Sequence, residues 1–526
     1  MQQSWLLFVL LAAIVVIAIV AKRAKLPYPI AFVIGGSLLA FVPHMPRFEL
    51  DPDWVFLIFL PPLLYAGGWQ TDWQAFKANL RPIAMLAVGL VVVTTGAVAI
   101  VAHALIPQMG WASAFVLGAV VSPPDPVAAG AVFERFSVPR RILAILDGEG
   151  LVNDASALVI YNFAIVAVLT GTFSLAHASL TFVGVCVGGI AVGLAFGYVI
   201  VNTMLALRKF ELSDYLIDNA IQLIAPYAIY LSCEPLGVSC VLATVTAGIF
   251  VSRRAEAIYA PEARLVAYAV WDVLIFLLNG LVFLLIGLQL EAIVRDPSFT
   301  FRELWIGVLI SLLVIVVRIV WVYPAAYLPR MLVPAIRKRE PYPPSNFIFI
   351  IGWSGMRGII SLAAALALPV VTRSGAPFPE RDTIVFITFC VIFATLVGQG
   401  LSLIPLLKLL RIDSGEDLDR REMEVRIAAL RAGIARLRTL EPFDSTDEWE
   451  VEGRILGEYE YRIAHLSGHL DGSIEPKAIA SDHRLQQEAL NAERGEILRQ
   501  RDEGEIPDEI YRKVQYDLDL ADERLS

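Results

Sequence analysis

Long apolar runs alternate with short polar connections through residues 1–412 of the 526-residue chain. A bilayer requires about 20 apolar residues per helix, and thirteen runs of roughly that size, some of them interrupted, occur in this part. They are residues 5–21, 29–43, 53–68, 82–106, 111–133, 141–170, 180–207, 214–232, 236–252, 265–289, 304–328, 345–371 and 383–407. The pattern predicts an all-α polytopic membrane protein with about thirteen transmembrane helices.

Residues 413–526 show a different pattern, in which apolar side chains recur at helical spacing within a highly charged segment. The recurring positions include Leu418, Val425, Leu430, Ile434 and Leu437. Such spacing is typical of amphipathic helices that are exposed to water. We therefore expect a cytoplasmic tail of short helices, which either is a solvated appendage or acts as a regulatory or dimer-supporting module.

Composition and charge agree with this division. A mean hydropathy of +0.66, with 57% hydrophobic and only 18% charged residues, excludes an ordinary soluble globular protein. Residues 1–412 contain 26 Lys and Arg against 22 Asp and Glu, whereas residues 413–526 contain 16 against 29, so the tail is strongly acidic. Four cysteines lie in or beside apolar runs without metal-ligand spacing, and we expect them to be small buried hydrophobes. They are Cys186, Cys233, Cys240 and Cys390.

Basic residues in the connections indicate how the chain crosses the membrane. A basic cluster follows the first run, which is the reverse of a cleavable signal peptide. If that cluster is cytoplasmic, the connections on its side contain seventeen Lys and Arg and those on the other side contain five. The seventeen are Lys22, Arg23, Lys25, Lys77, Arg81, Arg135, Arg140, Arg141, Arg208, Lys209, Arg253, Arg254, Arg264, Arg330, Arg337, Lys338 and Arg339, and the five are Arg47, Arg295, Arg302, Arg373 and Arg381. Because basic connections stay cytoplasmic, we expect the N-terminus outside and the C-terminus inside.

Two predicted spans contain a helix-breaking sequence around a charged residue. The fifth span contains Ser-Pro-Pro-Asp-Pro at residues 122–126, where the prolines remove backbone donors and clash with the preceding turn. The twelfth contains Gly-Trp-Ser-Gly-Met-Arg-Gly at residues 352–358, where glycines loosen the helix around Arg357. Each is the middle of three spans, and the two cross in opposite directions. This arrangement is expected of an inverted repeat in a secondary transporter, with half-helix ends lining an ion site; kinks that serve packing alone are the alternative.

A group of polar residues on the sixth span suits ion binding. Glu149, Gly150, Asn153 and Asp154 lie on one face of the predicted helix. Asp154 is the fourteenth residue of a thirty-residue run, which places it near the bilayer centre. A carboxylate there, beside an amide, can bind a proton or a small hard cation through oxygen. A purely structural pairing of Asp154 with Arg318 or Arg357 is the alternative.

The other buried charges have structural explanations beside the functional ones. Arg318 lies mid-way through the eleventh span, so its partner must come from another helix, and Glu149 is a candidate. Asp125, placed between prolines at the break, either caps the following half-helix or contacts the ion directly.

Four ordered motifs resemble those of the sodium/proton exchanger family, in its bacterial NhaP-like branch. They are Pro124-Asp125-Pro126-Val127-Ala128, Gly148-Glu149 with Asn153-Asp154, Trp271-Asp272 with Leu277-Leu278-Asn279-Gly280, and Gly355-Met356-Arg357-Gly358. The resemblance covers about residues 5–410.

This resemblance implies an architecture and a role for each site residue. The implied membrane domain, residues 1–412, has a core of about residues 82–170 and 304–410 and dimerisation spans at about 5–68 and 180–289, followed by the tail, 413–526. Asp154 would be the exchanging carboxylate, and Asn153 would replace the second aspartate of electrogenic relatives. The charge of Glu149 would be neutralised by Arg318, and Arg357 would act where the halves of the two broken helices cross. The broken-helix backbone would be formed at Pro124, Pro126, Gly355 and Gly358.

The chain departs from the family pattern at three positions. Many relatives have threonine at Pro124 and serine at Gly150, and both differences remove hydroxyl oxygens from the family site. Ala66 stands where many relatives have glutamate, so no role of that carboxylate transfers to this chain. The choice between sodium and potassium is therefore open at this point.

The sequence thus favours a homodimeric antiporter of the plasma membrane, the inner membrane in bacteria, for pH and cation homeostasis. It would exchange one Na⁺, with Li⁺ or K⁺ as further substrates, for one H⁺; K⁺/H⁺ exchange is the closest alternative. A cation channel or a membrane sensor with an output tail is the alternative of another class, although no carbonyl-filter sequence or arginine ladder supports it. No enzyme or nucleotide motif occurs, so we expect no cofactor, no nucleic acid and no partners besides the two ions, lipid and a second copy of the chain.

Overall fold

The computed structural model describes residues 2–43, 52–134, 136, 138–172, 174–294, 300–372, 375–412, 418–439, 446–471, 476–503 and 505–523. These residues form helices and connections, without a β-strand among them. The chain divides into two compact units, Met1–Ser414 and Gly415–Ser526. The predicted all-α fold class is therefore confirmed.

Each of the thirteen predicted runs contains helix in the structure. Within the described ranges, eight helices are long and apolar enough to cross a membrane, and three shorter apolar helices accompany them. The first run corresponds to α1 and the twelfth to the pair α18 and α19. The protein is thus a multi-pass membrane protein, while a count of thirteen crossings stays a prediction.

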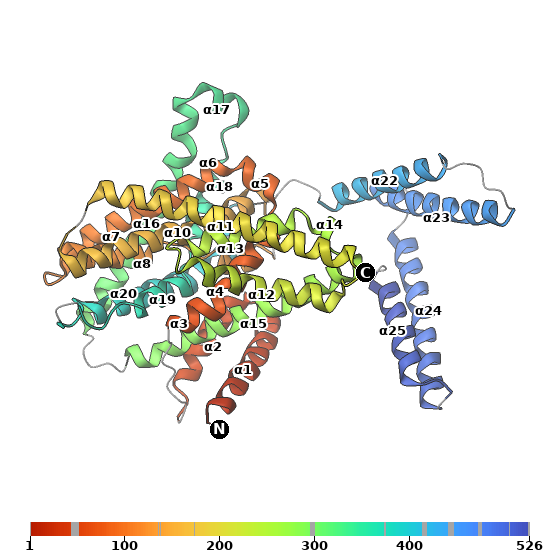
Figure 1. Ribbon diagram of the computed structural model, residues 1–526, viewed down its shortest axis with the longest axis horizontal. Coiled ribbons are helices and arrows are strands. Elements are labelled where there is room, and N and C mark those ends of the chain that lie inside the picture. Colours follow the sequence, from red (N-terminus) through yellow and green to blue (C-terminus); the bar gives the residue numbers. More distant parts are fainter. Residues whose placement is uncertain are drawn as a thin grey trace. The chain divides into compact units, whose positions relative to one another are not determined.

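The first unit, called the membrane unit below, runs from α1 to α21 in chain order (Figure 1). Its first part comprises α1 (Gln2–Ala24), α2 (Tyr28–Ala40), α3 (Pro52–Trp54), the π-helical stretch η1 (Val55–Phe59), α4 (Leu60–Gln70), α5 (Trp73–Ala78), α6 (Leu80–Ala84), the π-helical stretch η2 (Met85–Leu90), α7 (Val91–Leu105), α8 (Trp111–Val121), α9 (Pro126–Phe133) and α10 (Arg140–Thr170). Its second part comprises α11 (Leu175–Lys209), α12 (Tyr215–Cys233), α13 (Cys240–Ser252), α14 (Ala255–Ile258), α15 (Pro261–Val294), α16 (Phe301–Leu332), α17 (Pro334–Arg339), α18 (Ser345–Trp353), α19 (Ile359–Leu366), α20 (Arg381–Phe393), the π-helical stretch η3 (Ala394–Gln399) and α21 (Gly400–Leu409).

The second unit consists of four helices. They are α22 (Leu418–Leu437), α23 (Thr446–Asp471), α24 (Pro476–Asp502) and α25 (Asp508–Glu523). The expectation of short helices was wrong, because these have 16 to 27 residues. They pair as α22 with α23 and α24 with α25, so each covers part of the apolar stripe of its neighbour.

Some residues used in the predictions are not described. The side chain of Leu418 and residue Asp413, where the tail was predicted to begin, lie outside the described residues. The same holds for four of the basic residues that entered the orientation count, Arg47, Arg135, Arg295 and Arg373, and for the side chain of Arg339. The orientation of the chain in the membrane stays a prediction.

Local sequence explains where the important helices begin and end. α9 starts after Asp125, whose side chain accepts a hydrogen bond from Val127 N, and Pro126 occupies the first helical position, where no amide donor is needed. α16 starts with a capping box between Thr300 and Glu303. α10 ends at Gly171, which has a φ of 71° that glycine adopts without strain.

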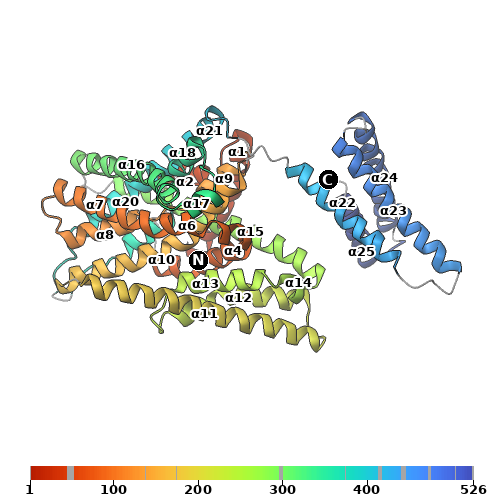
Figure 2. The ribbon, with the colours of Figure 1, turned by 90° about the horizontal axis from the view of Figure 1, so that it is seen from above.

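The two broken helices lie within two helix groups of similar construction. In the first group α8 packs against α7 and α10, and in the second α16 packs against α18 and α20, which in turn contacts α19. Contacts of α8 with α19 and α20 bring the groups together. Outside these groups, α11, α12 and α13 pack beside one another along the unit (Figures 1 and 2).

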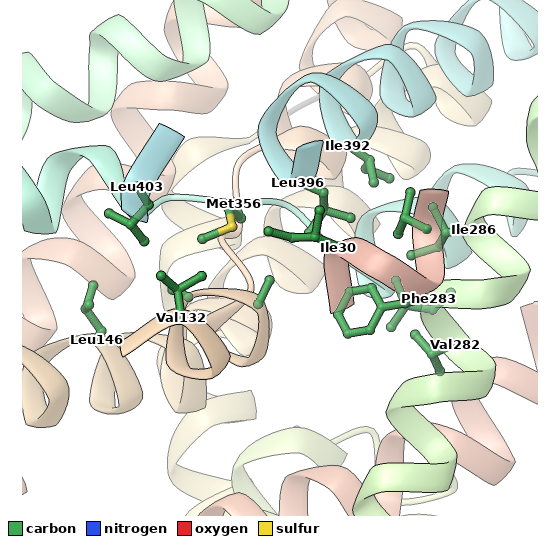
Figure 3. Close-up of a cluster of buried hydrophobic side chains, with 14 of the residues drawn as sticks. Ile30, Val132, Leu146, Val282, Phe283, Ile286, Met356, Ile392, Leu396 and Leu403 are labelled. Atoms are coloured by element: carbon green, nitrogen blue, oxygen red, sulfur yellow. The ribbon is translucent and has the colours of Figure 1, made fainter. Parts of the chain in front are cut away.

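A large apolar core surrounds the break between α18 and α19. Met356, which lies in that break, is fully buried and packs in one cluster with Val132 of α9 and Leu403 of α21. Figure 3 shows its sulfur among these side chains, with Ile30 of α2 and Leu396 of η3 beside it. The non-helical segment is therefore held by apolar contacts from several helices.

Close helix contacts in this unit depend on glycine. Gly36 of α2 and Gly287 of α15 face each other, and a Cβ atom on Gly287 would overlap the Val33 carbonyl oxygen and lie 2.7 Å from Ser37 N. Such small residues let helix backbones approach, which is how membrane helices gain packing energy in lipid.

We expect Gly287→Ala to destabilise the membrane unit by about 1–3 kcal/mol, because the added methyl group forces α2 and α15 apart. Thermal unfolding of the purified protein in detergent checks this as a lower Tm. Gly184→Ala on α11 is the matched control, since nothing lies within 4 Å of its Cβ position and alanine favours helix. Equal Tm values for the two variants would contradict the close packing.

Candidate functional site

The two broken helices meet at their breaks. The backbone N–H of Asp125, between α8 and α9, donates to the carbonyl of Met356, between α18 and α19, over 2.7 Å. The predicted breaks at residues 122–126 and 352–358 are both present, since α8 ends at Val121 and α18 at Trp353. Four helix ends therefore meet near one point inside the membrane unit.

Asp125 lies at the N-terminal ends of the two following half-helices. Its Oδ1 accepts from Val127 N at the start of α9 over 2.9 Å. Its Oδ2 lies directly against Gly358, the residue before α19, where a Cβ atom would overlap it. A carboxylate in this position compensates the positive ends of both helix dipoles. The predicted capping role is observed at α9, and an ion contact of Asp125 stays a prediction.

Arg357 lies at the C-terminal ends of the two preceding half-helices. Its guanidinium donates to the carbonyl oxygens of Val121 over 3.1 Å and Ser122 over 3.4 Å, and to that of Gly355. These carbonyls have no helical partner because both helices stop there. The side chain is fully buried, so its charge compensates the negative helix ends in place of water.

Glu149 of α10 and Arg318 of α16 form a buried ion pair. Nη1 and Nη2 of Arg318 donate to the two carboxylate oxygens over 2.5 Å and 2.8 Å, a bidentate geometry. Their side chains are 1% and 0% exposed. Arg318 Nε also donates to the Ile351 carbonyl near the end of α18 over 3.2 Å. The partner of Arg318 thus comes from another helix, as its position required.

Asn153 and Asp154 continue the same face of α10 toward the crossing. Asn153 Nδ2 donates to the Pro124 carbonyl over 2.7 Å, which fixes the amide against the break. Its Oδ1 is buried and has no hydrogen-bond partner among the described residues. Asp154 is 6% exposed and interacts electrostatically with Asp125. Two adjacent residues of α10 therefore provide an unsatisfied amide oxygen and a buried carboxylate, which are ligand types that suit a hard cation.

The prolines and glycines predicted for the breaks lie where the backbones pass closely. Pro126 packs against Gly150 of α10, and a Cβ atom on Gly150 would overlap the proline ring. Gly355 lies against the Arg318 side chain in the same manner. The structure has no room for a serine at Gly150 without a shift, so the missing hydroxyl of that position follows from its packing.

Two residues that stabilise the site were not predicted. Thr395 Oγ1 accepts from Arg357 N over 3.0 Å, and Gln399 Nε2 donates to the Trp353 carbonyl over 2.8 Å. Both belong to the π-helical stretch η3 and are buried. The sequence signal that could have identified them is their polar side chains within the otherwise apolar run 383–407.

We expect Glu149→Ala and Arg318→Ala each to destabilise the protein by about 3–5 kcal/mol, because each leaves the other charge buried without a partner. The double variant is expected to lose less than the sum. Unfolding in detergent, combined as a double-mutant cycle, measures the coupling.

Asp382→Ala is the control, since its carboxylate is 78% exposed and 3.6 Å from Arg381, and we expect its effect to stay below about 1 kcal/mol. Additive losses at positions 149 and 318 would show that their contact does not determine stability.

Comparison with known proteins identifies the family. The profile described as "Sodium/hydrogen exchanger, transmembrane" matches residues 9–409. The "Sodium, potassium, lithium and rubidium/H(+) antiporter" of Bacillus pumilus is 32% identical over 87% of this chain and 70% of its own length. The "Low-affinity Na(+)/H(+) antiporter NhaS1" of Synechocystis is 29% identical over 89% of this chain and 84% of its own.

A solved structure has the same fold. The sodium proton antiporter MjNhaP1 from Methanocaldococcus jannaschii superimposes with a TM-score of 0.60 at 16% identity, covering 78% of this chain and 100% of that chain. The profile match extends over most of the membrane unit and includes both broken helices. The chain therefore belongs to the sodium/hydrogen exchanger family.

Proposed function

We propose that the protein exchanges Na⁺ for H⁺ across the membrane by binding the two ions in turn at Asp154. Two neighbouring residues support this most directly: Asp154 is buried, and Asn153, which bonds to the break at Pro124, has an unsatisfied Oδ1. A hard cation requires several oxygen ligands. Asp154, Asn153 and Asp125 supply side-chain oxygens, and backbone carbonyls of the breaks can supply others.

The names of the relatives favour sodium as the cation. One similar protein is named for sodium, potassium, lithium and rubidium, and another for Na⁺ alone. Exclusive K⁺/H⁺ exchange is therefore not favoured, although Pro124 and Gly150 lack the hydroxyl groups of many relatives. Liposomes that contain the purified protein and a pH-sensitive dye, challenged with sodium, lithium and potassium, rank the three cations.

The charges at the site support one-for-one exchange. Glu149 is neutralised by Arg318, and Asn153 has no charge. Asp125 is engaged at the helix N-termini. This leaves Asp154 as the carboxylate at which a proton and a cation compete, so one turnover moves no net charge.

A secondary transporter is a better fit than the rival classes. The family match indicates an antiporter and gives no support to an enzyme. A channel or a sensor would pass or report ions without strict coupling, so saturable counterflow that requires both ions separates these classes from an antiporter.

The larger assembly belongs to the same proposal. The core would comprise the helix groups around α8 and α18, and α1–α4 with α11–α15 would form the dimerisation part of a homodimer. The excess of basic residues on one side supports an N-terminus outside and a cytoplasmic C-terminus in the plasma membrane, where exchange would serve pH and cation homeostasis.

Asp154→Asn is expected to abolish exchange, because it keeps size and hydrogen bonding but removes the charge for which the two ions compete. The liposome dye assay measures the loss, and size-exclusion chromatography verifies folding. Asp382→Asn, at a largely exposed position, is the control and is expected to transport normally. Transport at the wild-type rate by folded Asp154→Asn would refute this role.

Competition at one carboxylate also predicts a specific pH dependence. Below the pKa of the site, the apparent KM for the cation should rise about tenfold per pH unit, because protonation removes the form that binds the cation. The maximal rate at saturating cation should change much less. Initial rates over a grid of pH and sodium concentrations test this.

The voltage dependence of the same liposomes tests the stoichiometry. A potential of about 100 mV is worth roughly 2.3 kcal/mol per elementary charge moved. If one proton exchanges for one cation, this potential should leave the equilibrium distribution of ions unchanged. A shift of that equilibrium would reveal a second proton site, with Asp125 and Glu149 as the first candidates.

A further inference from the structure

One carboxylate connects three arginines at one end of the membrane unit. Glu340 Oε2, just after α17, accepts from Arg81 of α6 over 2.9 Å, Arg141 of α10 over 3.0 Å and Arg330 of α16 over 2.7 Å. Figure 1 shows α17 projecting from the unit near α6 and α18. Since each guanidinium keeps its charge, this cluster has three positive charges against one negative.

The cluster also has unused donors. Arg330 is 3% exposed, and its Nε has no hydrogen-bond partner within the described structure. Nε and Nη1 of Arg81 are buried and likewise without a partner there. Buried donors of a charged group are costly to leave unsatisfied, so the cluster is suited to receive a further anion.

A cavity of about 190 Å³ adjoins these arginines. Arg141 and Arg330 line it, together with Tyr342. The other thirteen of its sixteen lining residues are apolar, among them Leu86, Ile145, Val322 and Phe347. A free phosphate ion would gain nothing from these apolar walls, whereas a hydrocarbon chain can pack against them.

We propose that this cavity binds an anionic phospholipid, whose phosphate is held by Arg330 and Arg141 and whose apolar part lies against the cavity walls. Guanidinium groups bind phosphate oxygens in pairs, and basic pockets between transmembrane helices are suited to anionic head groups. The site is separate from Asp154 and does not depend on the proposed exchange.

The lipid would connect the two helix groups of the fold. Arg141 lies in the first turn of α10 in the first group, and Arg330 lies in the last turn of α16 in the second. Within the described part of the chain, Glu340 supplies the negative charge between them. A bound phosphate would add a second anion to this junction and raise the thermal stability of the membrane unit.

Native mass spectrometry of the full-length protein in detergent, titrated with phosphatidylglycerol or phosphatidylcholine, tests the proposal. We expect phosphatidylglycerol to bind more tightly and to raise Tm. Arg141 is 40% exposed, so the Arg141→Gln variant should fold, and it should bind phosphatidylglycerol about tenfold more weakly. Ala326→Leu should weaken binding as well, because it fills the cavity without changing a charge.

The matched control is Arg254→Gln. Arg254 lies on the same predicted side of the membrane but does not line the cavity, so its variant should bind phosphatidylglycerol as the unchanged protein does. Equal weakening by Arg141→Gln and Arg254→Gln would overturn the site, as would equal binding of the two lipids. Equal stabilisation by inorganic phosphate would overturn the lipid assignment and indicate a free-anion site.

Discussion

Hydrocarbon offers no hydrogen-bond partner to a backbone group, and four helix ends of this protein meet inside its membrane unit. Asp125 supplies negative charge at the two N-terminal ends, and Arg357 supplies donors and positive charge at the two C-terminal ends. The main-chain hydrogen bond between Asp125 and Met356 joins the breaks directly. Breaking two helices in a membrane is possible here because these two residues replace the missing backbone partners, and the remaining site contacts are arranged around them.

Much of this arrangement could be predicted from the sequence, because its causes are local. The three closely spaced prolines at 123, 124 and 126 remove backbone donors and clash with the preceding turn, and the glycines at 355 and 358 loosen the helix around Arg357. Runs of apolar residues identify the helices, and a buried Arg318 requires an acidic partner wherever it lies. The helical fold, both breaks and the origin of that partner on another helix follow from such rules.

Contacts between helices could not be predicted in the same way. The hydrogen bond from Asn153 to Pro124 and the support of Arg357 by Thr395 depend on the rotation and depth of each helix, which packing determines and periodicity does not. The same reason explains why the contact of Gly36 with Gly287, and the three arginines around Glu340, are apparent only in the folded chain.

The charges buried around the crossing affect whether the carrier can move without a bound ion. Asp125, Glu149 and Asp154 contribute three negative charges, and Arg318 and Arg357 two positive ones, so the group is neutral only when Asp154 holds a proton or a monovalent cation. An empty carrier would have to move an uncompensated charge through a region of low dielectric, at a cost of several kcal/mol. If Asp154 binds the ion as proposed, the same residue also opposes movement of the unloaded site, which would keep uncoupled movement of either ion small.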